Sequence, residues 1–292
     1  ARRASCQNNL KQWGLIFKMY SNESRGQRYP HLQVARFYAT NGNPYSSPRE
    51  AVALGPQTTS IYPEYMTDPR IIFCPSDKDS IQDVMGNPDG SINNPVNRPK
   101  DIDASYCYLG WVFDKMNDGL VPIETYPLLS GLIAALGGVM PSGMDVPTQL
   151  AAGLISAFDA AMITAYVGHD GLTLMEGADK DVDLTKATPY VPGYGNGGSD
   201  TLYRLREGIE RFLITDINNP AASAEAQSSI FIMMDELGSG AAIKKFNHIP
   251  GGCNVLFMDG HVEFIRYVND PTGCTPPVTP SVAVVVGGLS GD

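Results

Sequence analysis

Residues 246–267 read FNHIPGGCNVLFMDGHVEFIRY, and this stretch contains the strongest fold signal of the chain. Asp259-Gly260 stands between two runs rich in β-branched and aromatic residues, and Asp-Gly suits a two-residue type I′ turn because both central positions need positive φ. A turn there pairs Phe257 with Val262. The alternation then predicts a half-buried antiparallel hairpin, with one face made by Val255, Phe257, Val262 and Phe264 and the other by Asn254, Leu256, Met258, His261, Glu263 and Ile265.

The same stretch raises the alternative of a metal or catalytic site. His248, Asp259 and His261 could combine with Asp235 from upstream. The spacing of His248 and His261 matches neither a helical i, i+4 pair nor a zinc-finger pair, and Asp259 already has a role in the turn. We therefore predict structural roles for Asp259 and Gly260, with no catalytic, metal-binding or cofactor-binding residues. The chain also has no Gly-x-Ser-x-Gly nucleophile motif.

Two acidic pairs are candidate sites for a structural calcium ion. Asp77-x-Asp79 and Asp181-x-Asp183 offer hard oxygen ligands at calcium-like spacing, but neither has the glycine and terminal glutamate of a complete loop. Solvated turns are the other interpretation of both pairs.

The composition of the chain limits the classes of protein to which it can belong. The chain has 292 residues, 43% of them hydrophobic and 18% charged, which is typical of a folded domain with a real core. Its net charge is −10, and it has no cluster of basic residues beyond Arg2-Arg3, so we expect no nucleic-acid partner. No run of 18 apolar residues occurs, so no segment of this chain is expected to span a membrane.

The cysteines leave several disulfide patterns open. Five occur, at 6, 74, 107, 253 and 274, and none forms a Cys-x-x-Cys pair. Cys253 and Cys274 flank the hairpin and could close a loop, and Cys74 and Cys107 bracket a turn-rich segment. Buried free thiols are an equally good interpretation.

An amphipathic helix is predicted near the N-terminus, over residues 1–24. Cys6, Leu10, Trp13 and Phe17 recur at steps of four and three, which places them on one stripe that we expect to pack on a sheet. The helix starts abruptly behind Arg2-Arg3, which suggests an upstream part. Asn22-Glu23-Ser24 is a possible glycosylation site.

The remaining segments predict a mixed α and β domain. We expect loops over 27–70, short strands at 71–73, 104–113 and 228–236, a helical insertion at 127–168, and a second helix at 200–213 with Asp200 as its N-cap. Residues 271–292 are predicted to form a stiff proline-rich linker followed by a β-prone run at 281–286.

Several stretches, taken in order, resemble bacterial prepilin-like proteins, the pseudopilin group with a type II secretion or type IV pilin N-terminus. ARRASCQNNLKQWGLIF is similar to the segment after the membrane helix of that group, CPSD with a downstream ASYCY to its middle, and FNHIPGGCNVLFMDGHVEF to its C-terminal signature of a His, nine residues and Asp-Gly. DTLYRLREGIERFLITDINNP is also similar to a subset. Ten residues, not nine, separate His248 from Asp259 here, and the family's membrane helix and processing site lie outside this chain.

The resemblance implies an α+β, pilin-like fold over residues 1–292, in which an N-terminal helix packs on an antiparallel sheet, with residues 200–267 supplying a C-terminal helix and sheet. It also implies a non-enzymatic subunit of an extracellular, self-assembling helical filament, whose membrane contact comes only from the upstream helix. Two alternatives remain: a secreted surface-binding or adhesive module, and a metal-dependent hydrolase.

Overall fold

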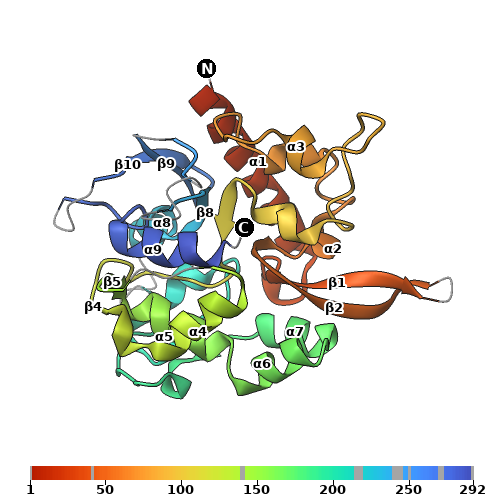
Figure 1. Cartoon of the computed structure of the whole chain (residues 1–292). Coiled ribbons are helices and arrows are strands. Elements are labelled where there is room, and N and C mark those ends of the chain that lie inside the picture. The colour runs from red at the N-terminus through yellow and green to blue at the C-terminus, as the bar shows by residue number, and fades with distance from the viewer. Residues whose placement is uncertain are drawn as a thin grey trace.

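The computed structural model describes residues 2–40, 43–138, 142–213, 220–238, 246–248, 251–268 and 273–290. It is a mixed α and β structure whose organising element is a four-stranded antiparallel sheet in the order β10-β9-β8-β3 (Figure 1). Its strands are β3 (Tyr106–Tyr108), β8 (Phe231–Asp235), β9 (Gly252–Phe257) and β10 (Val262–Arg266). The strands expected within 104–113 and 228–236 are thereby confirmed, with shorter bounds.

Helix α1 (Arg2–Glu23) confirms the predicted N-terminal helix, and it packs on one face of this sheet. The side chains of Cys6, Leu10, Trp13 and Phe17 are fully buried, in one cluster with Met233 and Leu256 of the sheet. Gly14 allows the close approach, because a Cβ there would lie 3.2 Å from a methyl carbon of Leu256.

The opposite face of the sheet packs on a second layer of helices. Alternate strand residues such as Met234 and Val255 belong to a separate core cluster, as period-two alternation requires. That cluster also holds residues of α4 (Pro127–Ala135), α5 (Thr148–Ala157), α6 (Ala160–Val167), α7 (Gly171–Ala178) and α9 (Pro280–Leu289). The helices expected over 127–168 are confirmed, and they share their core with the sheet (Figure 1).

Residues 27–70, expected to be loop-rich, instead contain a long antiparallel hairpin that extends from the body (Figure 1). Its strands are β1 (Leu32–Thr40) and β2 (Asn43–Pro56), with register shifts along the pair. Buried Gln33 and Gln57 donate from their amides to the Ala35 carbonyl, both at 2.8 Å, so polar residues that suggested a loop satisfy the backbone of an irregular ladder.

Shorter elements complete the fold. They are η1 (Arg25–Gln27), α2 (Thr58–Ile61), η2 (Pro69–Ile72), α3 (Ile81–Met85), η3 (Pro99–Asp103), β4 (Leu120–Pro122), η4 (Ile123–Thr125), β5 (Asp145–Pro147), β6 (Val182–Asp183), η5 (Leu184–Lys186), η6 (Asn196–Gly198), β7 (Thr201–Leu202), η7 (Ile209–Phe212) and α8 (Pro220–Ser229). The strand expected at 71–73 is wrong, because these residues lie in and just after η2, where Pro69 at the first helical position and Asp68 as N-cap start a helical turn.

The helix predicted over 200–213 is also wrong. Residues 201–202 form β7 and only 209–212 form a 3₁₀ turn. The backbone of this segment is satisfied by neighbours instead: Val112 N–H donates to the Tyr203 carbonyl and Leu205 N–H to the Gly110 carbonyl. Fully buried Arg204 holds the chain there by donating to the Tyr29 carbonyl at 2.8 Å. The expected cap, Asp200, accepts from Gly193 N–H at 3.0 Å.

The hairpin of residues 252–266 is confirmed, but its register differs by one residue. Val262 pairs with Leu256 and Phe264 with Asn254. Phe257 N–H donates to the His261 carbonyl, Gly260 N–H donates to the Phe257 carbonyl, and Gly260 alone in the turn has positive φ, at 90°. The loop is thus a type I turn followed by a left-handed glycine, rather than the expected type I′ turn.

The shift changes which β10 side chains share a face with β9. Leu256 and Val262 pack toward α1, whereas Val255, Phe257 and Ile265 belong to the opposite core cluster. Each predicted face therefore combined residues from opposite sides of the hairpin. A register shift of one residue moves every side chain of a strand to the other face relative to its partner strand.

The tail is a helix, not the expected strand. Thr279 caps α9 by accepting from Val282 N–H at 3.1 Å, and every residue of α9 is buried. Valine has high β-propensity, but a largely apolar decapeptide that fills the space between the sheet and α4–α5 follows its packing rather than its propensity (Figure 1).

Candidate functional site

A disulfide joins α1 to the segment after η2. Cys6 and Cys74 are bonded across a sequence separation of 68, with exposed fractions of 0% and 2%. The two pairings considered from the sequence, Cys253–Cys274 and Cys74–Cys107, are therefore wrong. Cys107 and Cys253 are buried thiols and Cys274 is a half-buried one, and none of the three forms a disulfide in the described structure. Burial raises the pKa of both the Cys107 and Cys253 thiols.

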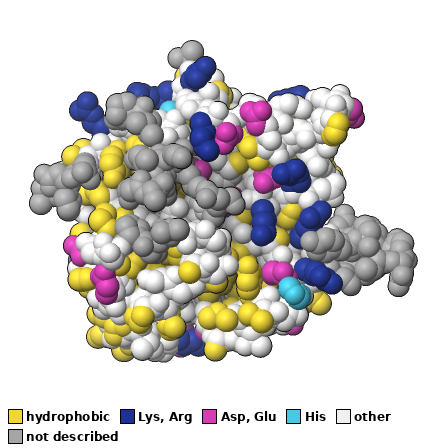
Figure 2. Space-filling model, in the orientation of Figure 1, with side chains coloured by type: hydrophobic (Ala, Val, Ile, Leu, Met, Phe, Trp, Pro, Cys, Tyr) yellow, Lys and Arg dark blue, Asp and Glu magenta, His cyan; other side chains and the backbone are white. Residues whose placement is uncertain are grey.

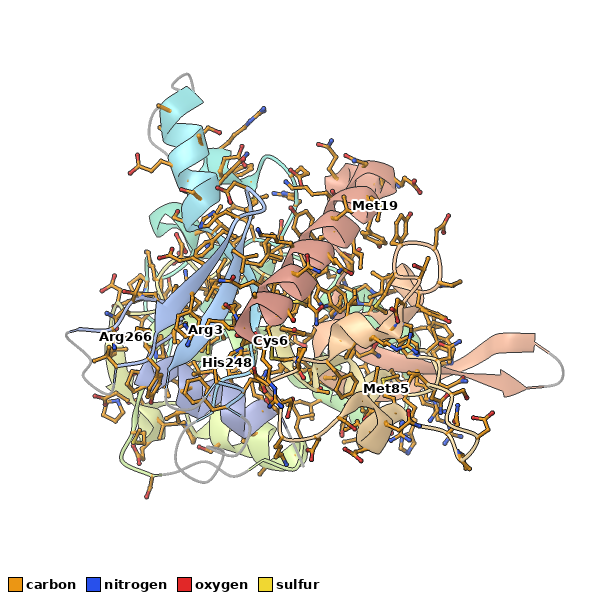
Figure 3. All side chains as sticks on the ribbon, turned by 90° about the horizontal axis from the view of Figure 1, so that it is seen from above. Arg3, Cys6, Met19, Met85, His248 and Arg266 are labelled. Carbon is orange, nitrogen blue, oxygen red and sulfur yellow. A yellow bond between two sulfur atoms is a disulfide. The ribbon has the colours of Figure 1, made fainter. Side chains whose placement is uncertain are left out.

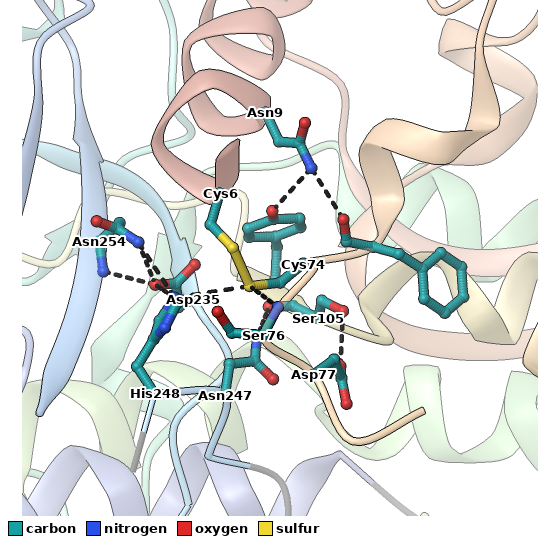
Figure 4. Close-up of a disulfide and its surroundings, with 12 residues drawn as sticks. Cys6, Asn9, Cys74, Ser76, Asp77, Ser105, Asp235, Asn247, His248 and Asn254 are labelled. Carbon is teal, nitrogen blue, oxygen red and sulfur yellow. Dashed lines mark hydrogen bonds and ion pairs between the residues drawn. A yellow bond between two sulfur atoms is a disulfide. The ribbon is translucent and has the colours of Figure 1, made fainter. Parts of the chain in front are cut away.

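His248 lies beside this disulfide (Figures 3 and 4). Its Nε2 atom is 3.6 Å from Cys74 Sγ and 3.0 Å from Asp235 Oδ2. Asp235 is the last residue of β8, and it is held in place from β9, where the backbone N–H and side-chain amide of Asn254 both donate to Oδ2 at 2.7 Å. Neighbouring strands thus fix the carboxylate that orients the imidazole.

Burial of the Asp235 carboxylate is electrostatically unfavourable. Its side chain is fully buried, and the loss of hydration raises the pKa of the carboxyl group, although the bonds from His248 and Asn254 act in the opposite direction. Among the described residues, Asp235 Oδ1 and Asn254 Oδ1 are buried with no hydrogen-bond partner. The cluster therefore retains unused acceptors, which is uncommon in a protein interior.

Further hydrogen bonds connect this cluster to the start of β3. Asn247 Nδ2 donates to the Ser105 carbonyl at 2.6 Å, and the Ser105 hydroxyl donates to Asp77 at 2.7 Å. On the other side of the disulfide, Asn9 Nδ2 donates to the Phe73 carbonyl at 2.9 Å and to the Tyr106 hydroxyl at 3.2 Å. Figure 4 shows these groups around the sulfur pair.

Motifs far apart in the sequence therefore meet at one place. The stretches ASCQNN, CPSD, ASYCY and FNH, which carry the resemblance described above, supply Cys6, Cys74, Ser105 and His248 respectively. Sequence reasoning identified each stretch but not their convergence, because only the packing of α1 on the sheet brings residues 6, 74 and 248 together. The Asn-His dipeptide before the hairpin was the available signal.

This arrangement differs from a nucleophilic triad. In such a triad the orienting carboxylate binds the imidazole nitrogen opposite the one that faces the nucleophile. Here Asp235 and Cys74 both face Nε2 of His248, and the sulfur is engaged in a disulfide. What the arrangement does chemically is tie α1 covalently to the body of the protein.

The four residues considered for a metal site do not come together. Asp235 and His248 form the buried pair, whereas Asp259 and His261 lie at the hairpin turn, with side chains 35% and 40% exposed. Asp259 Oδ1 accepts from His261 N–H at 3.0 Å and lies 2.6 Å from His261 Nδ1, which gives Asp259 the structural role expected of it. The four-residue grouping considered for a metal-dependent hydrolase is therefore not formed by these residues.

The acidic pairs considered for calcium have other partners. Asp77 accepts from Ser105, Asp79 pairs with Lys78 at 3.1 Å, and Asp181 accepts from Arg204 N–H. Asp183 caps η5. Within the described part of the chain, the groups of three or more His, Cys, Asp or Glu side chains able to hold a metal ion comprise just Cys6, Cys74 and His248.

Two further features lie on the surface of the protein. Asn22 of the possible glycosylation site is exposed in the last turn of α1.

A pocket of about 640 Å³ opens where η3 meets the β1–β2 hairpin. It is lined by basic, acidic and amide side chains that include Arg36, Arg98, Lys100 and Asn97. Figure 2 shows several Lys and Arg side chains gathered over this part of the face.

Comparisons of the chain with protein-family models, with curated proteins and with solved structures found no match. The resemblance to prepilin-like proteins therefore stays an expectation from the residues quoted above, and the structure shows a mixed α and β fold. Of the described helices, no single one has the length and apolarity to cross a membrane; α5 and α6, bent by 54°, meet that test only as a pair.

Proposed function

We propose that this protein is a structural, non-enzymatic subunit of an extracellular, pilus-like or pseudopilus-like helical filament. The supporting architecture is an N-terminal helix laid on a four-stranded antiparallel sheet with long connections. The observation that carries the proposal is the covalent attachment of this helix to the body by Cys6–Cys74. Subunits held in a filament by their N-terminal helices transmit load between helix and body, and a buried disulfide resists their separation.

The outward face of α1 offers a surface for a neighbouring subunit. Leu15 is 61% exposed and Met19 is 36% exposed, although both belong to a helix whose other face is fully buried. They are four residues apart and so lie together on the helix surface. Figure 3 shows Met19 near the C-terminal end of α1, away from Arg3, Cys6 and His248.

Electron microscopy of surface material from the native cell, labelled with antibodies against this chain, tests the proposal. Regularly spaced label along filaments is the expected result. The Leu15→Arg variant should abolish the filaments and leave the melting temperature of the soluble chain unchanged, because Leu15 is exposed. Val167→Arg on α6 is the matched control, since Val167 is 72% exposed on a different surface. Filaments lost only in the Val167 variant would contradict assembly through α1.

A second candidate is the adhesive module, and the pocket beside η3 favours it. Arg36 and Arg49 are directly opposed across the β1–β2 ladder, an arrangement that like charges disfavour. Arg98 and Lys100 line the same pocket as Arg36. The lining also holds Glu50 and Asp101, and Arg98 pairs with Asp101 at 2.6 Å. The small excess of basic side chains, in a chain of net charge −10, suits a carboxylate-bearing polysaccharide.

Binding to polygalacturonate, with neutral dextran as the comparison, tests this candidate. The double variant Arg98→Glu, Lys100→Glu should lose at least about tenfold in affinity at low salt, whereas Lys11→Glu on the exposed side of α1 should not. Equal binding by all three chains would exclude the pocket as the site.

A further inference from the structure

We propose that the reduced form of this protein binds one Zn²⁺ ion through Cys6, Cys74 and His248, with the Asp235 carboxylate as the fourth ligand. The disulfide and the metal site are alternative states of the same cluster. In both states α1 is tied to the body of the protein, once by a sulfur–sulfur bond and once by a shared ion.

The spacing of the ligand atoms fits a tetrahedral ion after a small movement. With Zn–S and Zn–N distances of about 2.3 and 2.0 Å, a tetrahedral site separates sulfur from nitrogen by about 3.5 Å and sulfur from sulfur by about 3.8 Å. Cys74 Sγ is already 3.6 Å from His248 Nε2, and the Cys6 sulfur lies within 4.8 Å of both. Two changes are required: separation of the two sulfur atoms once their bond is broken, and a movement of the Asp235 carboxylate toward the ion, because Asp235 lies outside the group of ligand atoms within 4.8 Å of one another.

The chemical types also fit. Two thiolates, an imidazole and a carboxylate belong to the ligand types that zinc prefers. Asp235 Oδ2 is 3.0 Å from the same Nε2 atom, and Asp235 Oδ1 is a fully buried oxygen with no hydrogen-bond partner among the described residues. A cation at this place would bind the buried carboxylate through an acceptor that nothing in the oxidised cluster uses, while the two thiolates balance the charge of the ion.

The exchange is balanced with a dithiol as reductant. The dithiol gives two electrons and two protons to the Cys6–Cys74 bond, which becomes two thiols, and the dithiol becomes a disulfide. Binding of Zn²⁺ then converts both thiols to thiolates and releases two protons. His248 binds as the neutral imidazole through Nε2, with its proton on Nδ1.

The test uses the full chain, reduced without oxygen by a water-soluble trialkylphosphine and then titrated with Co²⁺ or Zn²⁺. The phosphine takes oxygen from water to become its oxide, and the two hydrogens go to the sulfur atoms. The expected result is one equivalent of Co²⁺ with a sulfur-to-cobalt charge-transfer band and the visible spectrum of a tetrahedral ion. The oxidised chain should bind at least about a hundredfold more weakly, because it has lost both thiolates.

Variants separate this site from other cysteine chemistry. His248→Gln and Asp235→Asn should each weaken Zn²⁺ binding by about tenfold or more. Cys253→Ala, which removes a buried free thiol on β9, and His261→Gln, which changes an exposed imidazole, should leave the affinity within about twofold of wild type. Affinity that depends on Cys253 but not on His248 would overturn the proposal.

The metal site can still be tested if the reduced chain unfolds. If reduction unfolds the protein, Zn²⁺ should restore its circular dichroism and protect Cys6 and Cys74 from alkylation, as identified by peptide mapping. A reduced wild-type chain that takes up no stoichiometric metal, folded or unfolded, rejects the site.

Discussion

The indole Nε1 of Trp13 donates to the carbonyl oxygen of Ile71 at 3.3 Å, so α1 is anchored to the segment that carries Cys74 by a hydrogen bond as well as a disulfide. Phe17 stacks on Trp13 at 5.7 Å and on Tyr108 of β3 at 5.0 Å. The helix is thus attached at successive turns, first to the 71–74 segment and then to the sheet.

Trp13→Ala should lower the free energy of unfolding by about 3–5 kcal/mol, because it removes a fully buried ring and leaves the Ile71 carbonyl without its donor. Chemical denaturation with purified protein measures this loss. Leu15→Ala, on the exposed side of the same helix, should change stability by less than about 0.5 kcal/mol. Equal effects of the two changes would show that the buried stripe has been assigned to the wrong face.

Loss of the disulfide should also destabilise the monomer. A closed loop of this size, with Cys6 and Cys74 separated by 68 positions, predicts a loss of about 4 kcal/mol when both cysteines are replaced by alanine. Urea unfolding of Cys6→Ala, Cys74→Ala against wild type measures it. Cys274→Ser, which replaces a half-buried thiol outside the disulfide by a hydroxyl, is the control and should cost little. A double variant as stable as wild type would contradict the role assigned to the bond.

Stability should fall in mild acid because of His31. Burial and, second to it, the charge of buried Arg204 lower the pKa of His31 to about 4. The unfolded chain, with an ordinary pKa near 6.5, therefore binds a proton between about pH 6.5 and 4 that the folded chain does not bind. This contribution is fully present above pH 6.5 and decreases by about 3 kcal/mol as the pH falls to 4.

His31→Gln keeps a donor for the Leu32 carbonyl, which His31 Nδ1 contacts at 2.8 Å, and should flatten the fall in unfolding free energy between pH 6.5 and 4. A pH profile unaffected by the His31 change would place the acid sensitivity elsewhere.

Gly260→Ala should destabilise the protein by about 1 kcal/mol. A Cβ at Gly260 meets no atom within 4 Å, so the cost arises only from its φ of 90°. Gly131 of α4 is the matched control, since a Cβ there also meets nothing but its φ is helical. Gly131→Ala should stabilise by up to about 1 kcal/mol, and thermal unfolding of both variants compares the signs.

Removal of the tail should unfold the monomer. Deletion of residues 281–292 exposes the core that α9 covers, so the truncated chain should lose its cooperative thermal transition, whether or not it is assembled. This outcome separates a buried helix from a strand donated to a neighbouring subunit, for which the monomer would stay intact. Normal monomer stability after the deletion would show that α9 is dispensable to the core.

Much of the framework follows from local patterns. The spacing of Cys6, Leu10, Trp13 and Phe17 determined both the helix and its buried face, because a 3.6-residue period has one apolar side wherever that side packs. Alternation around residues 252–266 likewise predicted a hairpin. Its register was missed, because Asp-Gly is compatible with a two-residue and a three-residue loop, and only the pairing of β9 with β8 selects one.

Other features depended on contacts between distant segments. The run of valines at 282–286 has the propensity of a strand, and residues 202–212 have the period of a helix, yet burial against the sheet and the carbonyl partners of Arg204 reversed both. At 282–286 the free energy of packing exceeds the small difference in local propensity. At 202–212 the hydrogen bonds of buried polar groups exceed it.

By itself the sequence determined an acidic α+β chain with an amphipathic N-terminal helix, a C-terminal hairpin and separate motifs at Cys6, Cys74 and His248. Only the tertiary structure decided that these three residues meet, that Cys6 rather than Cys107 bonds to Cys74, and that Asp235 faces His248. The physical reason is that a disulfide or an ion pair forms between side chains that are neighbours in space. Spacing along a chain of 292 residues leaves that neighbourhood open until the helix has packed on the sheet.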